Sequence, residues 1–296
     1  MIYDKFPRAV DLGDVTAIDL HSIQAIVTMW SRDCDVVLVE SGSPCQDLTR
    51  LSMRRLGLAG LRSGLFLYVP TFIQKVHDAC AQCSNRFAFF EENVVMEEEW
   101  KRVISEMLGV KPFRIDTVTL SLAARDRLFW SSISMALEED EHLVEHETEV
   151  KVHLAGVPPE LNTILPSGQS RRVAAGTKMS TLTTGKALSR PPWCPTRRVS
   201  MYSSETQARW ADDSYRYPIF AYEENNLIFD EDGKWRTLNS TEREFLQSLP
   251  IGWTSAARDE EARCSLLGNS YQAHMVRRVV RDLRVAEVAR RGFRWC

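Results

Sequence analysis

The sequence of 296 residues predicts an α/β fold with a mainly parallel sheet and a smaller irregular region. Short apolar runs alternate with segments of helical periodicity along the first third of the chain. This order of strands and helices is typical of parallel sheets. An apolar content of 44% and a charged content of 26% are ordinary for a folded protein, and the length suffices for one large domain or two modest ones.

The first elements that we expect are a strand at residues 9–12, a helix at 18–30 and a strand at 36–39. Apolar side chains recur at helical spacing in the helix. The run at 36–39 is continuously apolar, as in a strand that is buried on both faces. Residues 41–44 follow it directly and form a turn.

A second series of elements follows. Apolar residues spaced by three and four predict a helix at 66–83. A third helix begins at the acidic residues 97–99, where negative charge suits a helix start, and ends at Gly109. The strands that we expect in this part of the chain are 87–90, 113–120 and 128–133.

The composition changes after residue 136. An acidic run at 138–149 contains no Lys or Arg and predicts a solvated connector or helix face. Between 166 and 210, eight Lys or Arg face one acid, which indicates a loop-rich basic module. From about Arg263 the chain returns to a helix. We therefore expect three parts, at 1–135, 136–262 and 263–296.

Three groups of residues could carry chemistry. Cys45 lies in the turn after a buried strand, and Glu92 follows the next strand. Because ligands bind outside the carboxyl ends of parallel strands, both are expected at one rim, with Asp14. Arg125 and Arg127 would share a strand face and could hold a polar ligand. Taken singly, a structural thiol, an exposed glutamate and a surface ion-pair cluster explain them better.

Taken together, these motifs resemble the DNA cytosine-5 methyltransferase family. The similarity includes Pro-Cys-Gln at 44–46, Glu-Asn-Val at 92–94, Arg-x-Arg at 125–127 and Gly-Asn-Ser at 268–270. Gly-Asp-Val at 13–15 is similar to the family's short cofactor motif. The wording around Cys45 and Glu92 is closest to the animal de novo branch, and the resemblance is weakest over 136–215.

The resemblance implies a Rossmann-like fold and S-adenosylmethionine as the methyl donor. Cys45 would be the thiolate that adds to carbon 6 of cytosine. Glu92 would contact ring nitrogen 3 and supply a proton, and Arg127, with Arg125 nearby, would hold the base. The expected cofactor contacts are Asp14, Val15, Pro44, Leu65, Asn269 and Ser270.

The resemblance also implies double-stranded DNA as the partner, with the target base extruded from the stack. The basic module would be the target-recognition region, since Lys and Arg attract phosphates without reading sequence. A flexible basic loop without base readout is an equally good interpretation. The expected DNA contacts are Arg171, Arg172, Lys178, Thr183, Lys186 and Arg190.

One family feature is missing upstream of Asp14, where a Phe-x-Gly-x-Gly-type loop and an acidic residue are expected. We therefore expect weak S-adenosylmethionine binding by the chain as written. The alternatives are an incomplete chain, or a family member without activity that acts as a DNA-binding or regulatory partner. A transfer-RNA cytosine-5 methyltransferase is a third interpretation, which the basic module disfavours modestly.

Other features suggest an intracellular protein, nuclear in a eukaryote. The seven cysteines show no pairing pattern, no apolar run reaches the roughly 18–20 residues of a membrane span, and no signal peptide is visible. No metal site is expected: Cys80 and Cys83 belong to an apolar helix stripe, and His142 and His146 lack further ligands. Homo- and hetero-oligomers are both compatible with the sequence.

Overall fold

The computed structural model describes residues 6–30, 35–49, 56–83, 86–121, 123–135, 137–156, 179–182, 199–229 and 234–288. The chain forms two compact units. We call residues 2–116, 126–155 and 279–296 the sheet unit, and residues 117–125 and 156–278 the second unit.

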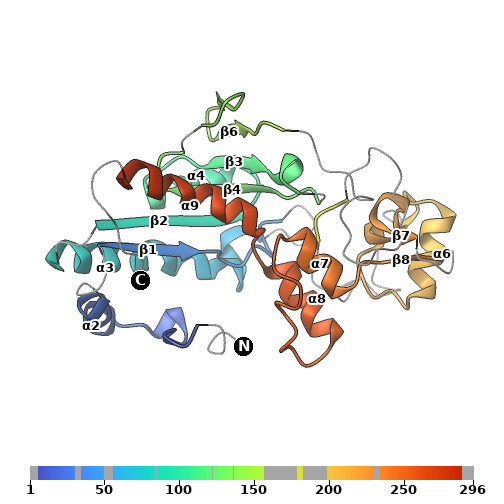
Figure 1. The fold of residues 1–296 in the computed structure, drawn as a ribbon, viewed down its shortest axis with the longest axis horizontal. Helices are drawn as coiled ribbons and strands as arrows, with labels where there is room; N and C mark the ends of the chain where they lie inside the picture. The colour runs from blue at the N-terminus through green and yellow to red at the C-terminus, as the bar shows by residue number, and fades with distance from the viewer. Residues whose placement is uncertain are drawn as a thin grey trace. The chain divides into compact units, whose positions relative to one another are not determined.

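A six-stranded sheet organises the sheet unit, in the order β1-β2-β4-β3-β6-β5 (Figure 1). Strands β1, β2, β3 and β6 point one way, and β4 and β5 point the other. The expected α/β class with a mainly parallel sheet is therefore confirmed. The strand bounds are β1 (Val36–Ser41), β2 (Arg86–Val94), β3 (Phe113–Asp116), β4 (Asp126–Ser131), β5 (His142–Glu145) and β6 (Val150–His153).

The expected helices of this unit are present as α2 (Leu20–Trp30), α3 (Tyr68–Cys83) and α4 (Glu98–Leu108). Helix α3 contacts α2, β1 and β2, and its Ile73, Val76 and Cys80 lie in the main core. Burial raises the pKa of the Cys80 thiol to about 11, with a smaller contribution from Cys83. Cys80 is therefore a packing residue, as predicted. Short 3₁₀ turns lie at Val15–Ala17, Gly57–Ala59 and Ser63–Leu67.

Two sequence predictions about this sheet are wrong. Residues 9–12 form no strand, and Val10 and Leu12 are 56% and 37% exposed. A strand needs a neighbour, and among the described strands β1 pairs with β2 alone. In addition, β2 continues through Glu92 to Val94, because antiparallel pairing of Val94 with Arg127 extends the ladder.

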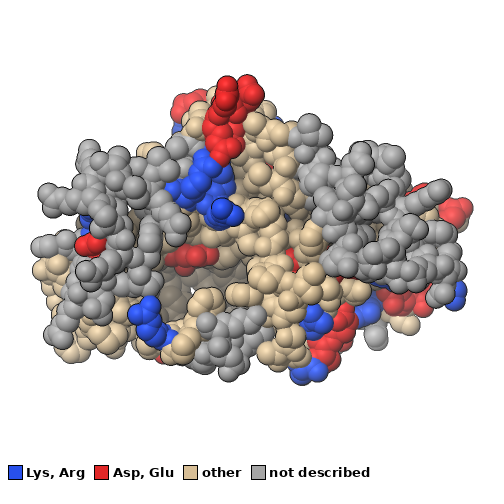
Figure 2. Space-filling model, viewed as in Figure 1, with Lys and Arg blue, Asp and Glu red and all other residues tan. Residues whose placement is uncertain are grey.

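The prediction for the acidic run is also wrong, because the run contributes β5 to the sheet and leads directly into β6. Side chains of β5 are exposed, and acidic side chains gather over this region in Figure 2. Glu149 is only 6% exposed: it accepts hydrogen bonds from Lys101 Nζ at 2.5 Å and Arg114 Nη1 at 3.0 Å. Pairing of Val150 with Phe113 brings Glu149 to these cations.

The second unit is mainly helical where it is described. Its Ser204–Asp212 helix, capped by the Ser203 hydroxyl that accepts from Thr206 N, contradicts the expected lack of helix before residue 210. The six expected DNA contacts lie outside the described residues. The elements are η4 (Thr117–Thr119), α6 (Ser204–Asp212), η6 (Ile219–Tyr222), η7 (Glu224–Asn226), β7 (Ile228–Phe229), β8 (Trp235–Arg236), α7 (Ser240–Leu246), α8 (Glu260–Asn269) and the first residues of α9 (Ala273–Val288), which continues into the sheet unit from residue 279.

The expected C-terminal helix is confirmed as α9, with Met275 and Val279 buried on its apolar stripe. Two of its arginines are not simply solvated. Arg278 is only 7% exposed, and Arg281 forms an ion pair with Glu138. No helix in the described ranges combines the length and apolarity that a membrane crossing requires.

The Glu149 cluster generates the first prediction. We expect Glu149→Ala to lower the free energy of unfolding by about 3–5 kcal/mol, because Lys101, 2% exposed, loses its buried partner. Urea denaturation measures this loss. The exposed pair of Arg102 and Glu147 is the matched control, and Glu147→Ala should cost less than about 1 kcal/mol. Equal losses in the two variants would contradict the assignment.

The stabilisation that the Glu149 cluster contributes should decrease in acid. Burial raises the pKa of Glu149, but hydrogen bonds from Lys101 and Arg114 outweigh it and hold the pKa below its usual range. The stabilisation is therefore complete above the ordinary glutamate pKa of about 4.3 and is lost as pH falls through the lowered value.

Candidate active site

The candidate site lies where β1 and β2 end side by side. The two strands are parallel, with Ser41 of β1 paired to Glu91 of β2. The turn that follows β1 and the last residues of β2 therefore meet at one edge of the sheet. Cys45 lies in that turn, and Glu92 lies at that end of β2.

Cys45 begins a tight turn. Its carbonyl oxygen accepts hydrogen bonds from Leu48 N at 3.0 Å and Thr49 N at 2.9 Å. Cys45 is partly exposed and forms no disulfide, whereas Cys80 and Cys264 are buried. Cys45 is thus not enclosed in the core, as a nucleophile requires.

The segment at 57–63 contacts the turn of Cys45 and restrains it through hydrogen bonds to Asp47. Asp47 N donates to the hydroxyl of the fully buried Ser63 at 3.1 Å, and Ser63 N donates to Asp47 Oδ2 at 3.3 Å. At Gly60 an added Cβ would lie 2.2 Å from Asp47 Oδ2, so only glycine permits this close approach.

Ser43 connects the turn to β2. Its N–H and hydroxyl both donate to Glu91 Oε1, at 3.1 and 2.5 Å. Asn93 Nδ2 donates to Ser43 Oγ at 3.0 Å and lies 3.4 Å from the Ser43 carbonyl oxygen. Glu91 and Asn93 are 0% and 1% exposed, so these contacts are shielded from water.

Glu92 forms an ion pair with Arg127. Arg127 Nε lies 2.9 Å from Glu92 Oε1, and each side chain is 12% exposed. Arg127 pairs across the ladder with Val94, which shares a strand face with Glu92. The antiparallel strand β4 thus places the Arg127 guanidinium next to the Glu92 carboxylate at the end of β2.

Arg125 has a different environment from Arg127. It lies before β4, in the second unit, and is 7% exposed. Its Nη2 donates to the carbonyl oxygen of Ser270 at 2.5 Å. The expectation that both arginines share one strand face is therefore wrong, because only Arg127 belongs to the strand.

The expected cofactor residues divide between the units. Asp14 and Val15 form a short turn in the sheet unit, where Asp14 Oδ1 accepts from Thr16 N at 2.9 Å. This hydrogen bond lowers the pKa of the exposed Asp14 carboxyl. Leu65 is 37% exposed, and Pro44 is partly exposed. Asn269 and Ser270 end α8 in the second unit.

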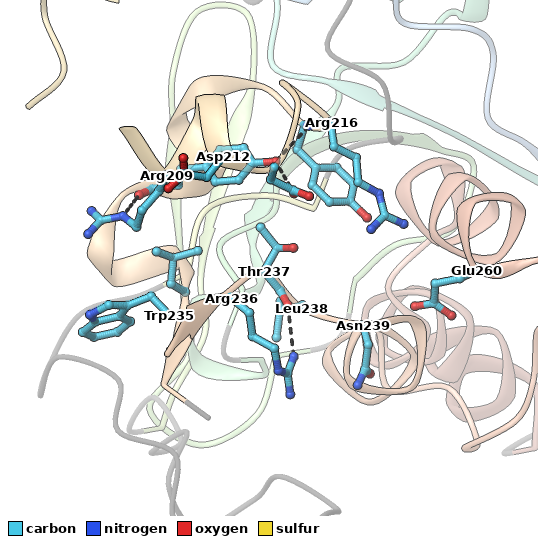
Figure 3. Close-up of a pocket in the computed structure, with 13 residues that line it drawn as sticks. Arg209, Asp212, Arg216, Trp235, Arg236, Thr237, Leu238, Asn239 and Glu260 are labelled. Atoms are coloured by element: carbon cyan, nitrogen blue, oxygen red, sulfur yellow. Dashed lines mark hydrogen bonds between the residues drawn. The ribbon is translucent and has the colours of Figure 1, made fainter. Parts of the chain in front are cut away.

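A cavity of about 660 Å³ lies in the second unit (Figure 3). It is formed by α6, β8 and the start of α7, and none of its lining residues was predicted to carry chemistry. Its charges are mixed, and several are already engaged: Arg236 pairs with Glu242 at 2.9 Å, and Tyr222 donates to Asp213 at 2.6 Å. The sheet edge shared by the Cys45 turn and the Glu92–Arg127 pair, rather than cavity size, locates the candidate site.

Comparisons with known proteins agree with the sheet architecture. No family model matches the chain. A crystal structure of a mutant of the DNMT2 protein of Spodoptera frugiperda matches with a TM-score of 0.52 and 15% identity, over 95% of this chain and 87% of that one. The Entamoeba histolytica methyltransferase EhMeth gives a TM-score of 0.46 and 13% identity, over 95% and 86% of the two chains. The first likeness shows a Rossmann-like methyltransferase fold.

Sequence reasoning missed the residues that hold the turn. The sequence placed Asn93 in the Glu-Asn-Val motif and Ser43 in the turn at 41–44, but it assigned no contact to either residue or to Asp47. Glu91 was passed over, although a carboxylate within the apolar run of a central strand was a visible signal.

The pair of Glu92 and Arg127 generates the next prediction. We expect Arg127→Met to lower the free energy of unfolding by about 3–5 kcal/mol, because a largely buried carboxylate loses its cation. Combining it with Glu92→Gln should recover part of the loss, with a coupling energy of about 1–3 kcal/mol in a double-mutant cycle. Arg258→Met, at an exposed pair with Asp259, is the control and should change little. Additive losses would refute the pairing.

Proposed function

We propose that this protein is a cytosine-5 methyltransferase that acts on DNA, with Cys45 as the nucleophile. The observation that carries the proposal is that the turn of the partly exposed Cys45 and the Glu92–Arg127 pair lie at the same sheet edge. The resemblance of the motifs at 44–46, 92–94 and 125–127 to this family supports it, as does the methyltransferase fold.

In this proposal, Cys45 acts as a thiolate and forms a bond to carbon 6 of the extruded cytosine. The electron pair of the carbon 5–carbon 6 double bond is then available at carbon 5. S-adenosylmethionine, when bound, supplies the methyl group for carbon 5. Loss of the proton from carbon 5 restores the double bond and breaks the carbon–sulfur bond, which frees the thiolate.

Glu92 and Arg127 would assist by holding the base. A carboxyl group at ring nitrogen 3 can share a proton with it as negative charge develops there. The guanidinium of Arg127 fixes the Glu92 carboxyl in one orientation and contributes positive charge near the ring. In this way the pair favours electron flow into the ring during thiolate addition.

DNA is the proposed substrate because of two sequence features. The wording around Cys45 and Glu92 is closest to the animal de novo branch, and the segment at 166–210 carries eight basic residues against one acid. Such a segment attracts nucleic-acid phosphates. RNA carries the same phosphates, so an RNA substrate is the alternative outcome of the test below.

A second candidate is a non-catalytic, DNA-binding member of the same fold. One observation favours it: the described residues provide only part of an S-adenosylmethionine site. Strand β1 pairs with β2 alone among the described strands, and Asp14 and Leu65 are exposed. Pro44, Asp14 and Leu65 could contact the cofactor, but no described glycine-rich loop encloses it.

This partial fit predicts weak cofactor binding. We expect calorimetry with S-adenosylmethionine and the purified chain to give a binding free energy weaker than about −8 kcal/mol, which corresponds to a Kd above about 1 µM. Micromolar or tighter binding would contradict the prediction. In that case, loss of affinity in Asp14→Ala would identify the exposed carboxylate as a contact.

Covalent trapping tests the proposed function. A DNA duplex that carries 5-fluorocytosine should form a stable adduct in the presence of S-adenosylmethionine, because fluorine at carbon 5 cannot leave as a proton does. Mass spectrometry should place the adduct on Cys45. We expect Cys45→Ala to lose it completely and Cys83→Ala, which alters another partly exposed cysteine, to keep it.

The other outcomes separate the candidates. An adduct that forms only on an RNA hairpin with 5-fluorocytosine would identify RNA, and not DNA, as the substrate. Binding of DNA without any adduct would support the non-catalytic candidate. An adduct of equal yield in Cys45→Ala would remove Cys45 from the chemistry.

A further inference from the structure

A glutamate inside β2 has no part in the chemistry proposed above. Glu91 follows Phe90 and precedes Glu92, and its side chain is 0% exposed. Successive side chains of a strand point to opposite faces, so Glu91 faces away from the ion pair of Glu92. Carboxyl groups are almost never fully buried unless other groups hold them, so its environment requires an explanation.

Glu91 is held by the turn that carries Cys45. The Ser43 N–H and hydroxyl donate to Glu91 Oε1 at 3.1 and 2.5 Å. Asn93, two residues along the same face, donates to Ser43 Oγ at 3.0 Å. The Ser43 hydroxyl is therefore fixed between one acceptor and one donor, and both belong to a central strand of the sheet.

The position of Ser43 is transmitted to Cys45 over a short link. Only Pro44 lies between them, and its ring fixes φ at about −65°. On the downstream side, the Cys45 carbonyl oxygen is held by Leu48 N and Thr49 N. The nucleophile is thus restrained on both sides, and Glu91 provides the upstream restraint.

We propose that Glu91 is a positioning residue for Cys45, which holds Ser43 from within the sheet and thereby sets the location of the thiol at the strand edge. The catalytic meaning of this inference rests on the proposed function. Because Glu91 is fully buried, it acts through Ser43 and does not touch a substrate.

The charge state of Glu91 suits this role. Within the described ranges, Glu91 forms no ion pair. Burial raises the pKa of Glu91, hydrogen bonds from Ser41 and Ser43 oppose the rise, and the negative charge of Glu92 adds to it. The charged groups on the neighbouring strands are Glu40 of β1 and Asp126 and Arg127 of β4; Asp126 pairs with Arg114 and Arg127 with Glu92. Glu91 therefore keeps its proton to a higher pH than an ordinary glutamate, and a neutral acid does not oppose a nearby thiolate.

The reactivity of Cys45 tests the inference without any nucleic acid. Iodoacetamide labelling of the full chain, resolved by site with mass spectrometry, gives the alkylation rate of Cys45 as a function of pH. We expect Glu91→Gln to retain the wild-type profile, because the amide oxygen still accepts from Ser43. Glu91→Ala should shift both the rate and the pH midpoint. Glu99→Gln, at an exposed glutamate of α4, is the control and should change neither.

Ser43→Ala provides a second test in case Glu91→Ala does not fold. Ser43 is partly exposed and lies outside the strands, so we expect removal of its hydroxyl to leave β2 intact. We expect this variant to shift Cys45 reactivity in the same direction as Glu91→Ala. A folded Ser43→Ala protein with wild-type Cys45 reactivity would overturn the proposal. Glu91→Gln behaving as badly as Glu91→Ala would also overturn it, because charge rather than position would then matter.

Adduct formation provides the catalytic readout. At saturating 5-fluorocytosine duplex, we expect Glu91→Ala to form the Cys45 adduct about 10- to 100-fold more slowly with an unchanged Kd for DNA, since a small displacement of a reacting atom costs this much. Loss of DNA affinity at an unchanged adduct rate would contradict a positioning role. If no variant forms an adduct, the proposed function fails, while the alkylation experiment still decides the role of Glu91.

Stability against pH gives an independent check. An acid whose folded pKa is raised contributes its full stability below the ordinary glutamate pKa of about 4.3 and loses it as pH rises towards the folded value. We therefore expect the Tm of the wild type to fall relative to Glu91→Gln as pH increases from 4 to neutral. Parallel Tm profiles would show that Glu91 is not a proton-holding acid.

Discussion

The parallel register between β1 and β2 is the constraint on which the candidate site depends. Pairing of Ser41 with Glu91 places the turn after β1 directly beside the end of β2. Ser43 then forms hydrogen bonds with Glu91 and Asn93, and Asp47, further along the same turn, forms a hydrogen bond with Ser63. A slip of one residue would move every side chain of β2 to the opposite face and separate the turn from its anchors.

The adjacent carboxyl groups of Glu91 and Glu92 lie on opposite faces of β2 and have different environments. Glu92 meets the guanidinium of Arg127 and remains partly accessible at 12%. Glu91, one residue earlier, is fully buried, and burial favours its protonated form although hydrogen bonds from the serines oppose this. Alternation along one strand thus separates a group suited to contact a ligand from a group suited to hold the backbone.

Periodicity predicted the main elements well because the core imposes it. Helices α2, α3 and α4 and strand β1 form where apolar spacing indicated, since each buries its apolar residues in the common core. The predictions fail where the structure of a segment depends on its pairing with another strand. Residues 9–12 lack a strand neighbour, whereas the acidic run at 138–149 contains β5 because β5 pairs with β6, and β6 pairs in parallel with β3. Its Glu149 is buried because Lys101 and Arg114, distant in sequence, neutralise it.

The sequence by itself determined the fold class, the turn of Cys45 after a buried strand, and the order of the motifs that contain Glu92 and Arg127. These follow from local patterns, which depend on residues close together in the chain. Only the tertiary structure decided that Arg127 pairs with Glu92 while Arg125 binds the Ser270 carbonyl, and that Glu91 anchors Ser43. Such contacts join residues separated by 35 to 145 positions, and strand register and burial, rather than local spacing, select them.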